Sequence, residues 1–295
     1  MVSRPVVGCT GWGDAPRYHD RVKQPLHPDD PIQQPYEVRF DWGRDGLRGI
    51  APTAGVIVVI DAISFTTTVE MGVSLGLEVQ PFEGVRPDAE DADAQGRFGD
   101  ARLAGRRGDP GVSLSPSSMT EQNVAEFGAR RAVVPSLNGS RLTALAATYG
   151  VPVVAASLRN RTAVARWILD YQNRLGRRAM VAIVAAGEVR SDETVRFAVE
   201  DMLTAGAVID ALGTLGVDAC SPEAAAACAS YTGLARGVGH LFTASVSGGE
   251  LLADDQGEDI RVACRTDVSE TVPVLVDGVF VGAERVTSEE SSLLP

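Results

Sequence analysis

The chain has 295 residues, 44% of them hydrophobic and 22% charged, a composition typical of a globular protein with one large domain or two small ones. Its formal net charge of −12 would repel nucleic acid and anionic membranes, so neither is an expected partner. The cysteines (Cys9, Cys220, Cys228 and Cys264) show no CxxC spacing, and no apolar run is long enough to span a membrane. We therefore expect a cytoplasmic protein with reduced, mostly buried thiols and neither a disulfide framework nor a zinc site.

The N-terminal part of the chain changes character near Tyr36. Residues 1–35 are rich in proline and lack a sustained periodicity, which predicts an extended arm. Alternation over 36–42 predicts a strand, and residues 43–53 a loop or a short helix. The unbroken run VIVVI at 56–60 is typical of a strand that is buried on both faces of a parallel or mixed sheet.

A hydroxyl-rich segment follows this buried strand. Asp61 ends the strand, and Ser64, Thr66 and Thr67 stand at the start of a predicted helix. The unpaired N–H groups and partial positive charge of a helix start bind anions. A carboxylate beside them can hold a divalent cation that binds the same anion. The pattern also fits a simpler interpretation, in which the hydroxyls cap the helix and Asp61 caps a turn.

Strands and helices continue to alternate along the rest of the chain. Further strands are predicted at 77–83, 131–136, 151–157, 180–186, 262–264 and 272–276. Helices are predicted at 87–96, 120–128, 141–149, 161–175, 200–215 and 222–236, with loops at 102–119 and 239–249, a helix after the second loop, and a polar tail at 286–295. This order, without an internal repeat, predicts one α/β domain over 36–285, a three-layer α/β/α sandwich with a mostly parallel (mixed) sheet.

Polar side chains follow several of the predicted strands. Four of them stand just beyond the end of an apolar strand: Asp61, Asn138, Asn160 and Glu188. Because ligands of such sheets bind beyond the carboxyl ends of the strands, we expect these side chains to share one crevice. Polar strand ends are also a general feature of α/β proteins, so the pattern alone does not establish a functional site.

Seven blocks of sequence, taken in order, carry a family resemblance. They are DAISFTTT (61–68), LAGRRG (103–108), LSP (114–116), LNGSRL (137–142), SLRN (157–160), the segment 185–210, and SVSGGELL with GEDIRVACRTD within 245–267. In this order they resemble the 2-phosphosulfolactate phosphatase family. Over about Glu37 to Phe280, the resemblance implies a compact α/β/α homodimer. It also implies an Mg²⁺-dependent release of phosphate from 2-phospho-3-sulfolactate.

Three positions depart from the family pattern. Ser64 stands where the family has an arginine, Arg106 where it has an acidic residue, and Ser247 where it has a histidine. The substrate can therefore differ from phosphosulfolactate. The alternative function is that of a catalytically weak member that binds a small anion or serves as an assembly protein.

The resemblance and the strand-end positions together indicate acidic residues for chemistry. Asp61 and Asp201 are the expected catalytic residues, and Asp61, Glu188 and Asp201 the expected Mg²⁺ ligands. Asp61 could instead be a nucleophile that forms an aspartyl phosphate. Asp201 is preferred to its neighbour Glu200, since adjacent helical residues point about 100° apart and cannot both face one metal. Glu188 fits a surface loop equally well.

A small phosphorylated anion is the expected partner. The residues expected to bind it are Ser64, Thr66, Thr67, Arg107, Asn138, Gly139, Ser140, Arg141 and Asn160. Arg107 and Arg141 are candidates for a two-point clamp, because a planar guanidinium matches two anion oxygens. Asn138, which precedes Gly139, also fits a simpler interpretation as an ordinary turn residue. Since Lys23 is the only lysine and no Cys-x5-Arg loop occurs, the sequence excludes P-loop and cysteine-phosphatase sites.

Overall fold

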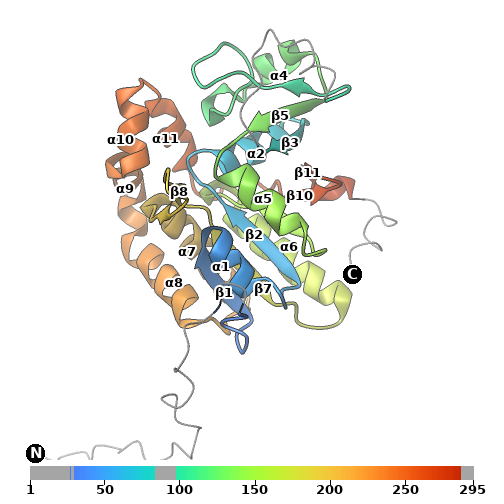
Figure 1. Ribbon diagram of the computed structural model, residues 1–295, viewed down its shortest axis with the longest axis vertical. Coiled ribbons are helices and arrows are strands. Elements are labelled where there is room, and N and C mark those ends of the chain that lie inside the picture. The colour runs from blue at the N-terminus through green and yellow to red at the C-terminus, as the bar shows by residue number, and fades with distance from the viewer. Residues whose placement is uncertain (1–26, 28–29, 84–97, 287–295) are drawn as a thin grey trace, which may run out of the picture.

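The structure, a computed structural model, describes residues 27, 30–83 and 98–286 (Figure 1). Its strands are β1 (Val38–Trp42), β2 (Val56–Ile60), β3 (Glu78–Phe82), β4 (Arg102–Leu103), β5 (Arg131–Pro135), β6 (Val153–Ala155), β7 (Val181–Ala185), β8 (Glu188–Val189), β9 (Val195–Arg196), β10 (Pro273–Val276) and β11 (Val279–Gly282). Its α-helices are α1 (Gly43–Ile50), α2 (Phe65–Ser74), α4 (Glu121–Phe127), α5 (Gly139–Ala147), α6 (Arg161–Leu175), α7 (Val199–Thr214), α8 (Pro222–Leu234), α9 (Val238–Ala244), α10 (Val246–Ala253) and α11 (Gly257–Ala263).

The strands of the described residues form one large mixed sheet and a small hairpin. The sheet has the order β1-β7-β2-β6-β10-β11-β3-β5-β4, and β8 pairs with β9. Pairing is parallel at both ends of the sheet, while β10 and β11 run antiparallel to their neighbours. The predicted α/β fold with a mostly parallel, mixed sheet is confirmed.

Strand β2 shows why the sheet lies between two layers of helices. Its residues alternate between two cores: Val56, Val58 and Ile60 pack in one, and Ile57 and Val59 in the other. The first core contains residues of α6 and α7, and the second contains residues of α1 and α5. In Figure 1, α1 and α5 accordingly lie in front of β2 and β7, with α6 behind them. Burial on both faces explains the unbroken apolar sequence of this strand.

The remaining helices extend the fold at one side of the sheet. Helix α8 packs on α7 and β1, and α9, α10 and α11 follow it along the same side of the molecule (Figure 1). Helix α2 packs in a separate core with β3, β5 and Phe280 of β11. None of the helices described is long and apolar enough to cross a membrane.

Two of the predicted elements are wrong, and a third, the loop at 102–119, begins with strand β4. Residues 262–264, predicted as a strand, lie at the end of helix α11, because so short an apolar run does not reveal its period. Residues 239–249, predicted as a loop, lie largely in α9 and α10. The side chain of Ser245 caps α10 by accepting the N–H of Gly248, so the glycines here begin a helix.

Several other predictions concern residues outside the described part of the chain, and the prediction for the cysteines needs correction. The helix predicted at 87–96 falls among residues that the structure does not describe, as do nearly all of the N-terminal arm, the tail beyond 286, and Cys9. The three cysteines that are described form no disulfide, but they are half-buried rather than buried as predicted.

Candidate active site

Asp61 lies where β2 ends, beside the end of β7. Ile60 is paired with Ala185, so the segments that follow these two strands leave the sheet side by side. The chain then turns sharply into α2. The hydroxyls of Thr66 and Thr67 donate to the carbonyl oxygens of Asp61 (2.9 Å) and of the next residue (2.8 Å). These bonds hold the turn, so both hydroxyls act within the loop.

The carboxyl of Asp61 is 7% exposed and lies against the starts of two helices. Burial, followed by the charge of Glu188, raises its pKa to about 7. Hydrogen bonds from the backbone N–H groups of Phe65 and Gly139, and the charge of Arg107, act in the opposite direction. Phe65 begins α2 and Gly139 begins α5, so the partial positive charge of two helix starts meets at Asp61.

Close packing at Gly139 joins these two helix starts. A Cβ atom at this position would lie 2.2 Å from the Phe65 ring and 2.7 Å from Oδ2 of Asp61, so only glycine fits. The Ser136 hydroxyl bridges the same segments, accepting the Gly139 N–H (3.1 Å) and donating to Asp61 Oδ2 (3.4 Å). The segments 61–68 and 138–140 are therefore in direct contact.

Glu188 is tied to Asn138. The Asn138 amide donates to Oε2 of Glu188 (2.8 Å) and accepts the N–H of Val189 (3.3 Å). On its other side, Glu188 accepts the hydroxyl of Ser247 (3.4 Å). Three of the four strand-end residues, from β2, β5 and β7, are thus brought together.

Asp201 holds the turns that follow β2 and β7. Its Oδ1 accepts the N–H of Ala62 (2.8 Å) and its Oδ2 the N–H of Gly187 (2.9 Å). The side chain is 4% exposed, and burial, with the charges of Asp61 and Glu200, raises its pKa well above that of an ordinary carboxyl. Asp201 therefore lies beside Asp61, with both carboxylate oxygens bound to backbone.

Asn160 and Ser140 bond elsewhere in the fold. The Asn160 amide forms a capping box with Ser157 and donates to the carbonyl oxygens of Thr271 (3.0 Å) and Ala155 (3.4 Å). The Ser140 hydroxyl donates to the carbonyl of Val134 (3.3 Å). Both side chains are buried and hydrogen-bonded to the backbone. Asn160 therefore fixes a loop in the structure and does not join the other strand-end residues in the crevice.

Arg107 reaches the site through a residue that sequence reasoning missed. One terminal nitrogen of Arg107 donates to Asp259, and the other donates to the hydroxyl of Ser64 (2.9 Å). Asp259 is fully buried in α11 and also accepts the Ser115 hydroxyl and the N–H of Ser117 (3.0 Å). Its GEDI block was visible in the sequence, but the buried contact joins segments 152 residues apart.

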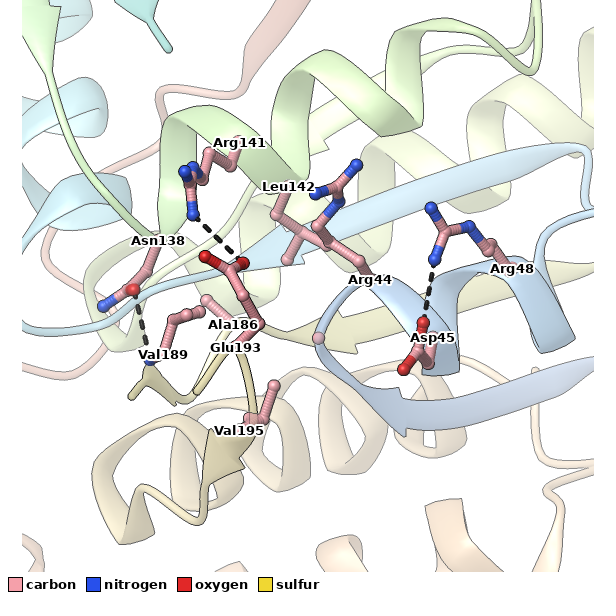
Figure 2. A pocket seen from close by; sticks show the side chains of 11 residues that line it. Arg44, Asp45, Arg48, Asn138, Arg141, Leu142, Ala186, Val189, Glu193 and Val195 are labelled. Atoms are coloured by element: carbon pink, nitrogen blue, oxygen red, sulfur yellow. Dashed lines mark hydrogen bonds and ion pairs between the residues drawn. The ribbon is translucent and has the colours of Figure 1, made fainter. Parts of the chain in front are cut away.

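Arg141 lines a cavity of about 190 Å³ next to Asn138 (Figure 2). Its guanidinium points toward Glu193 and donates to it at 3.4 Å. Arg44 and Arg48, which sequence reasoning did not single out, line the same cavity. The sequence offered little sign that these two arginines line a cavity, because arginines in a short helix usually point into solvent.

Asp61 and Glu188 are the acidic side chains of this site that could hold a magnesium ion. Within the described ranges, no group of three or more Asp, Glu, His or Cys side chains is gathered closely enough to hold a metal. Both oxygens of Asp201 fix the turns after β2 and β7, whereas Asp61 and Glu188 lie close enough for their charges to interact, so these two are the candidate ligands. Magnesium sites commonly use one or two carboxylates and complete their shell with water and substrate oxygens. The donor chemistry of this pair therefore suits Mg²⁺.

Together, the fold and the site define an α/β protein with a buried carboxylate site at the carboxyl ends of parallel strands. A family model described as 2-phosphosulpholactate phosphatase matches residues 47–278, most of the chain. The chain belongs to this phosphatase family. A probable 2-phosphosulfolactate phosphatase of Gloeothece citriformis (strain PCC 7424) is similar, with 28% identity over 226 residues that cover 74% of this chain and 87% of that protein.

Proposed function

We propose that the protein is an Mg²⁺-dependent phosphatase that hydrolyses a small phosphorylated hydroxy-acid, as a 2-phosphosulfolactate phosphatase does. Family membership supports the class of reaction. The observation that carries the site is the buried Asp61 carboxyl, which faces Glu188, Arg107 and the starts of α2 and α5. A phosphoryl group needs concentrated positive charge, and these groups are arranged to supply it or to hold a cation.

Each residue has a distinct place in this proposal. Asp61 and Glu188 would hold the magnesium ion, which supplies positive charge to phosphoryl oxygens. Arg107, fixed by Asp259, would hold a second oxygen beside Ser64. Asp201 keeps the turn of Asp61 in place. Asp61 could also attack the phosphorus as a nucleophile, and the site geometry is compatible with either role.

The proposal is tested by measuring phosphate release. The wild-type protein is assayed with 2-phosphosulfolactate, 2-phospholactate and phosphoglycolate, with Mg²⁺ and with EDTA. We expect release from at least one of these esters that stops in EDTA and returns when Mg²⁺ is added in excess. Release that EDTA does not affect would contradict the metal requirement, and no release from any ester would contradict the function.

One observation favours the alternative, a family member that binds an anion without efficient hydrolysis. The two helix starts that could cradle a phosphate already face the protein's own Asp61 carboxyl. Ser64, at a family arginine position, accepts a hydrogen bond from Arg107. A protein of this kind would bind phosphate or an unreactive phosphonate in calorimetry and still release no phosphate in the assay above.

A further inference from the structure

Another cavity lies at the opposite end of the strands that lead to the candidate active site. Gly55 and Met180, which precede β2 and β7, line this cavity, whereas Asp61 and Gly187 follow the same strands. Both strands have five residues, and a strand rises about 3.3 Å per residue, so the two places are roughly 20 Å apart. We call it the Arg177 cavity, and one small substrate cannot reach both it and Asp61.

The wall of the Arg177 cavity combines positive charge with apolar surface. Among its lining residues in the described part of the chain, Arg177 and Arg178 are charged and none is acidic. Ala54, Val151 and Met180 supply the apolar part of the wall. The volume of about 350 Å³ equals that of roughly twelve water molecules, which is room for an acid group joined to a ring. In a chain with a net charge of −12, such a wall favours an anion locally.

The two arginines of the wall differ in their partners. Arg178 pairs with Glu37 at 3.2 Å, and Glu37, a buried carboxylate that does not line the cavity, also accepts the amide of Gln172 (3.0 Å). Arg177 forms no hydrogen bond or ion pair with any residue that the structure describes. Its planar guanidinium is therefore available to two oxygens of an incoming anion.

A buried third guanidinium adds positive charge next to this wall. Arg39 is 1% exposed and donates to the hydroxyl of Thr53 (2.7 Å), which lines the cavity. Its other acceptors among the described residues are also uncharged, the carbonyl oxygens of Gln34 (3.0 Å), Tyr36 (3.0 Å) and Ile50 (3.1 Å). Burial lowers the pKa of Arg39, yet an arginine keeps its charge in a protein. Because a buried charge without a counter-ion is costly, an anion nearby would stabilise it.

We propose that the Arg177 cavity binds a small organic anion, with its acid group at Arg177 and its apolar part against Val151 and Met180. Three guanidinium groups, set against the carboxylate of Glu37, supply the net positive charge. The ligand class is a phosphonate, phosphate ester or carboxylate that carries a ring or a short alkyl group. This ligand is distinct from the substrate at Asp61. Its binding requires no turnover, so the proposal does not depend on the proposed function.

The binding experiment uses phenylphosphonate, whose C–P bond a phosphatase does not hydrolyse. It is titrated by calorimetry at low salt into wild type, Arg177→Ala and the control Arg166→Ala. Arg166 is an exposed arginine of α6 outside the cavity, paired with Glu270, so its variant matches the change of charge. We expect wild type and Arg166→Ala to bind equally, and Arg177→Ala to bind at least about tenfold more weakly. Equal binding by all three proteins, or no binding by wild type, would overturn the proposal.

A phosphonate could also bind at the candidate active site, and Arg107→Lys separates the two places. The loss caused by Arg177→Ala should be the same in the Arg107→Lys background, because each arginine would contact a different phosphonate molecule. Binding that depends on Arg107 and not on Arg177 would place the probe at the active site alone and overturn the proposal. Phosphate release by Arg177→Ala should equal that of wild type, and a lower kcat would contradict the separation of the two places.

The apolar part of the ligand is tested with methylphosphonate, which has the same acid group and no ring. Wild type should bind phenylphosphonate at least about fivefold more tightly, because the ring buries apolar surface. Ala54→Leu, which fills part of the cavity without a change of charge, should remove this preference, and thermal unfolding checks that the variant is folded. Equal affinity of wild type for the two phosphonates would contradict the proposed ligand class.

Discussion

At the scale of single residues, the ionisation of Asp61 links the site to stability. Burial and the charge of Glu188 raise its pKa from 3.8 to about 7. The folded protein therefore keeps this proton up to about pH 7, whereas the unfolded chain releases it near pH 4. Asp61 stabilises the fold at low pH, and this contribution is lost as the pH rises through the folded pKa.

Urea unfolding of the metal-free protein tests this sign. Between about pH 5 and 8, the wild type should lose stability relative to Asp61→Asn, by at most about 4 kcal/mol, because Asn cannot ionise. Added Mg²⁺ should restore stability to the wild type at pH 8 and not to the variant. A stability difference that stays flat across this range would show that Asp61 titrates like an ordinary carboxyl.

Arg107 and Asp259 should act as one unit. Arg107→Lys keeps the charge and loses the fork that joins Asp259 to Ser64, while Asp259→Asn releases the guanidinium. Each change should lower kcat/KM for phosphate release about tenfold or more, and the double variant should be little worse than either one. Arg131→Lys, which alters the Glu78 pair away from the site, is the control. Effects that simply add would show that the two residues act separately.

At the scale of elements, sequence reasoning succeeded where burial leaves a periodic trace. The run at 56–60 predicted a central strand, and Asp61 was placed correctly at its end. The same reasoning missed α11 and the two-residue strands β8 and β9, which are too short to show a period. Asp259 was missed because its burial depends on Arg107 and Ser115 from a distant loop.

Helix α7 provides an internal comparison of two glycines. A Cβ atom on Gly206 would lie 2.1 Å from the carbonyl oxygen of Ala227 in α8, whereas one on Gly213 would have no neighbour within 4 Å. Gly206→Ala should therefore lower the free energy of unfolding by about 1–3 kcal/mol, since the helices must move apart. Gly213→Ala should raise it by a few tenths to about 1 kcal/mol, because alanine favours a helix. Chemical denaturation measures both, and equal effects would mean that α7 and α8 do not pack this closely.

At the scale of the whole molecule, the site depends on a contact between segments that follow two well-separated strands of the sheet. Between β2 and β5 lie β6, β10, β11 and β3, yet Gly139, just after β5, packs against Asp61 after β2. The antiparallel strands β10 and β11 join the two parallel parts through single residue pairs, Val274 with Val154 and Phe280 with Val79. A sequence pattern shows where strands end but not that segments after distant strands are in contact. The sequence could therefore indicate the site residues but not the crevice that they form together.

This arrangement predicts where an anion binds. Phosphate soaked with Mg²⁺ into crystals should lie between the 64–68 helix start and the 138–140 turn, since the net charge of −12 disfavours phosphate binding elsewhere. The metal should contact Asp61 at about 2.1 Å. Phosphate bound only at Arg44 and Arg141, with none near Asp61, would move the reacting group into the cavity and contradict the proposed roles.

The measurement that tests the central claim most directly is Mg²⁺-dependent phosphate release by Asp61→Asn beside wild type. Asn keeps the shape of the side chain and removes the charge, so release from 2-phosphosulfolactate should fall at least about a hundredfold. Circular dichroism and thermal unfolding should show that the variant remains folded. Undiminished release by a folded Asp61→Asn protein would remove Asp61 from the reaction and contradict the account.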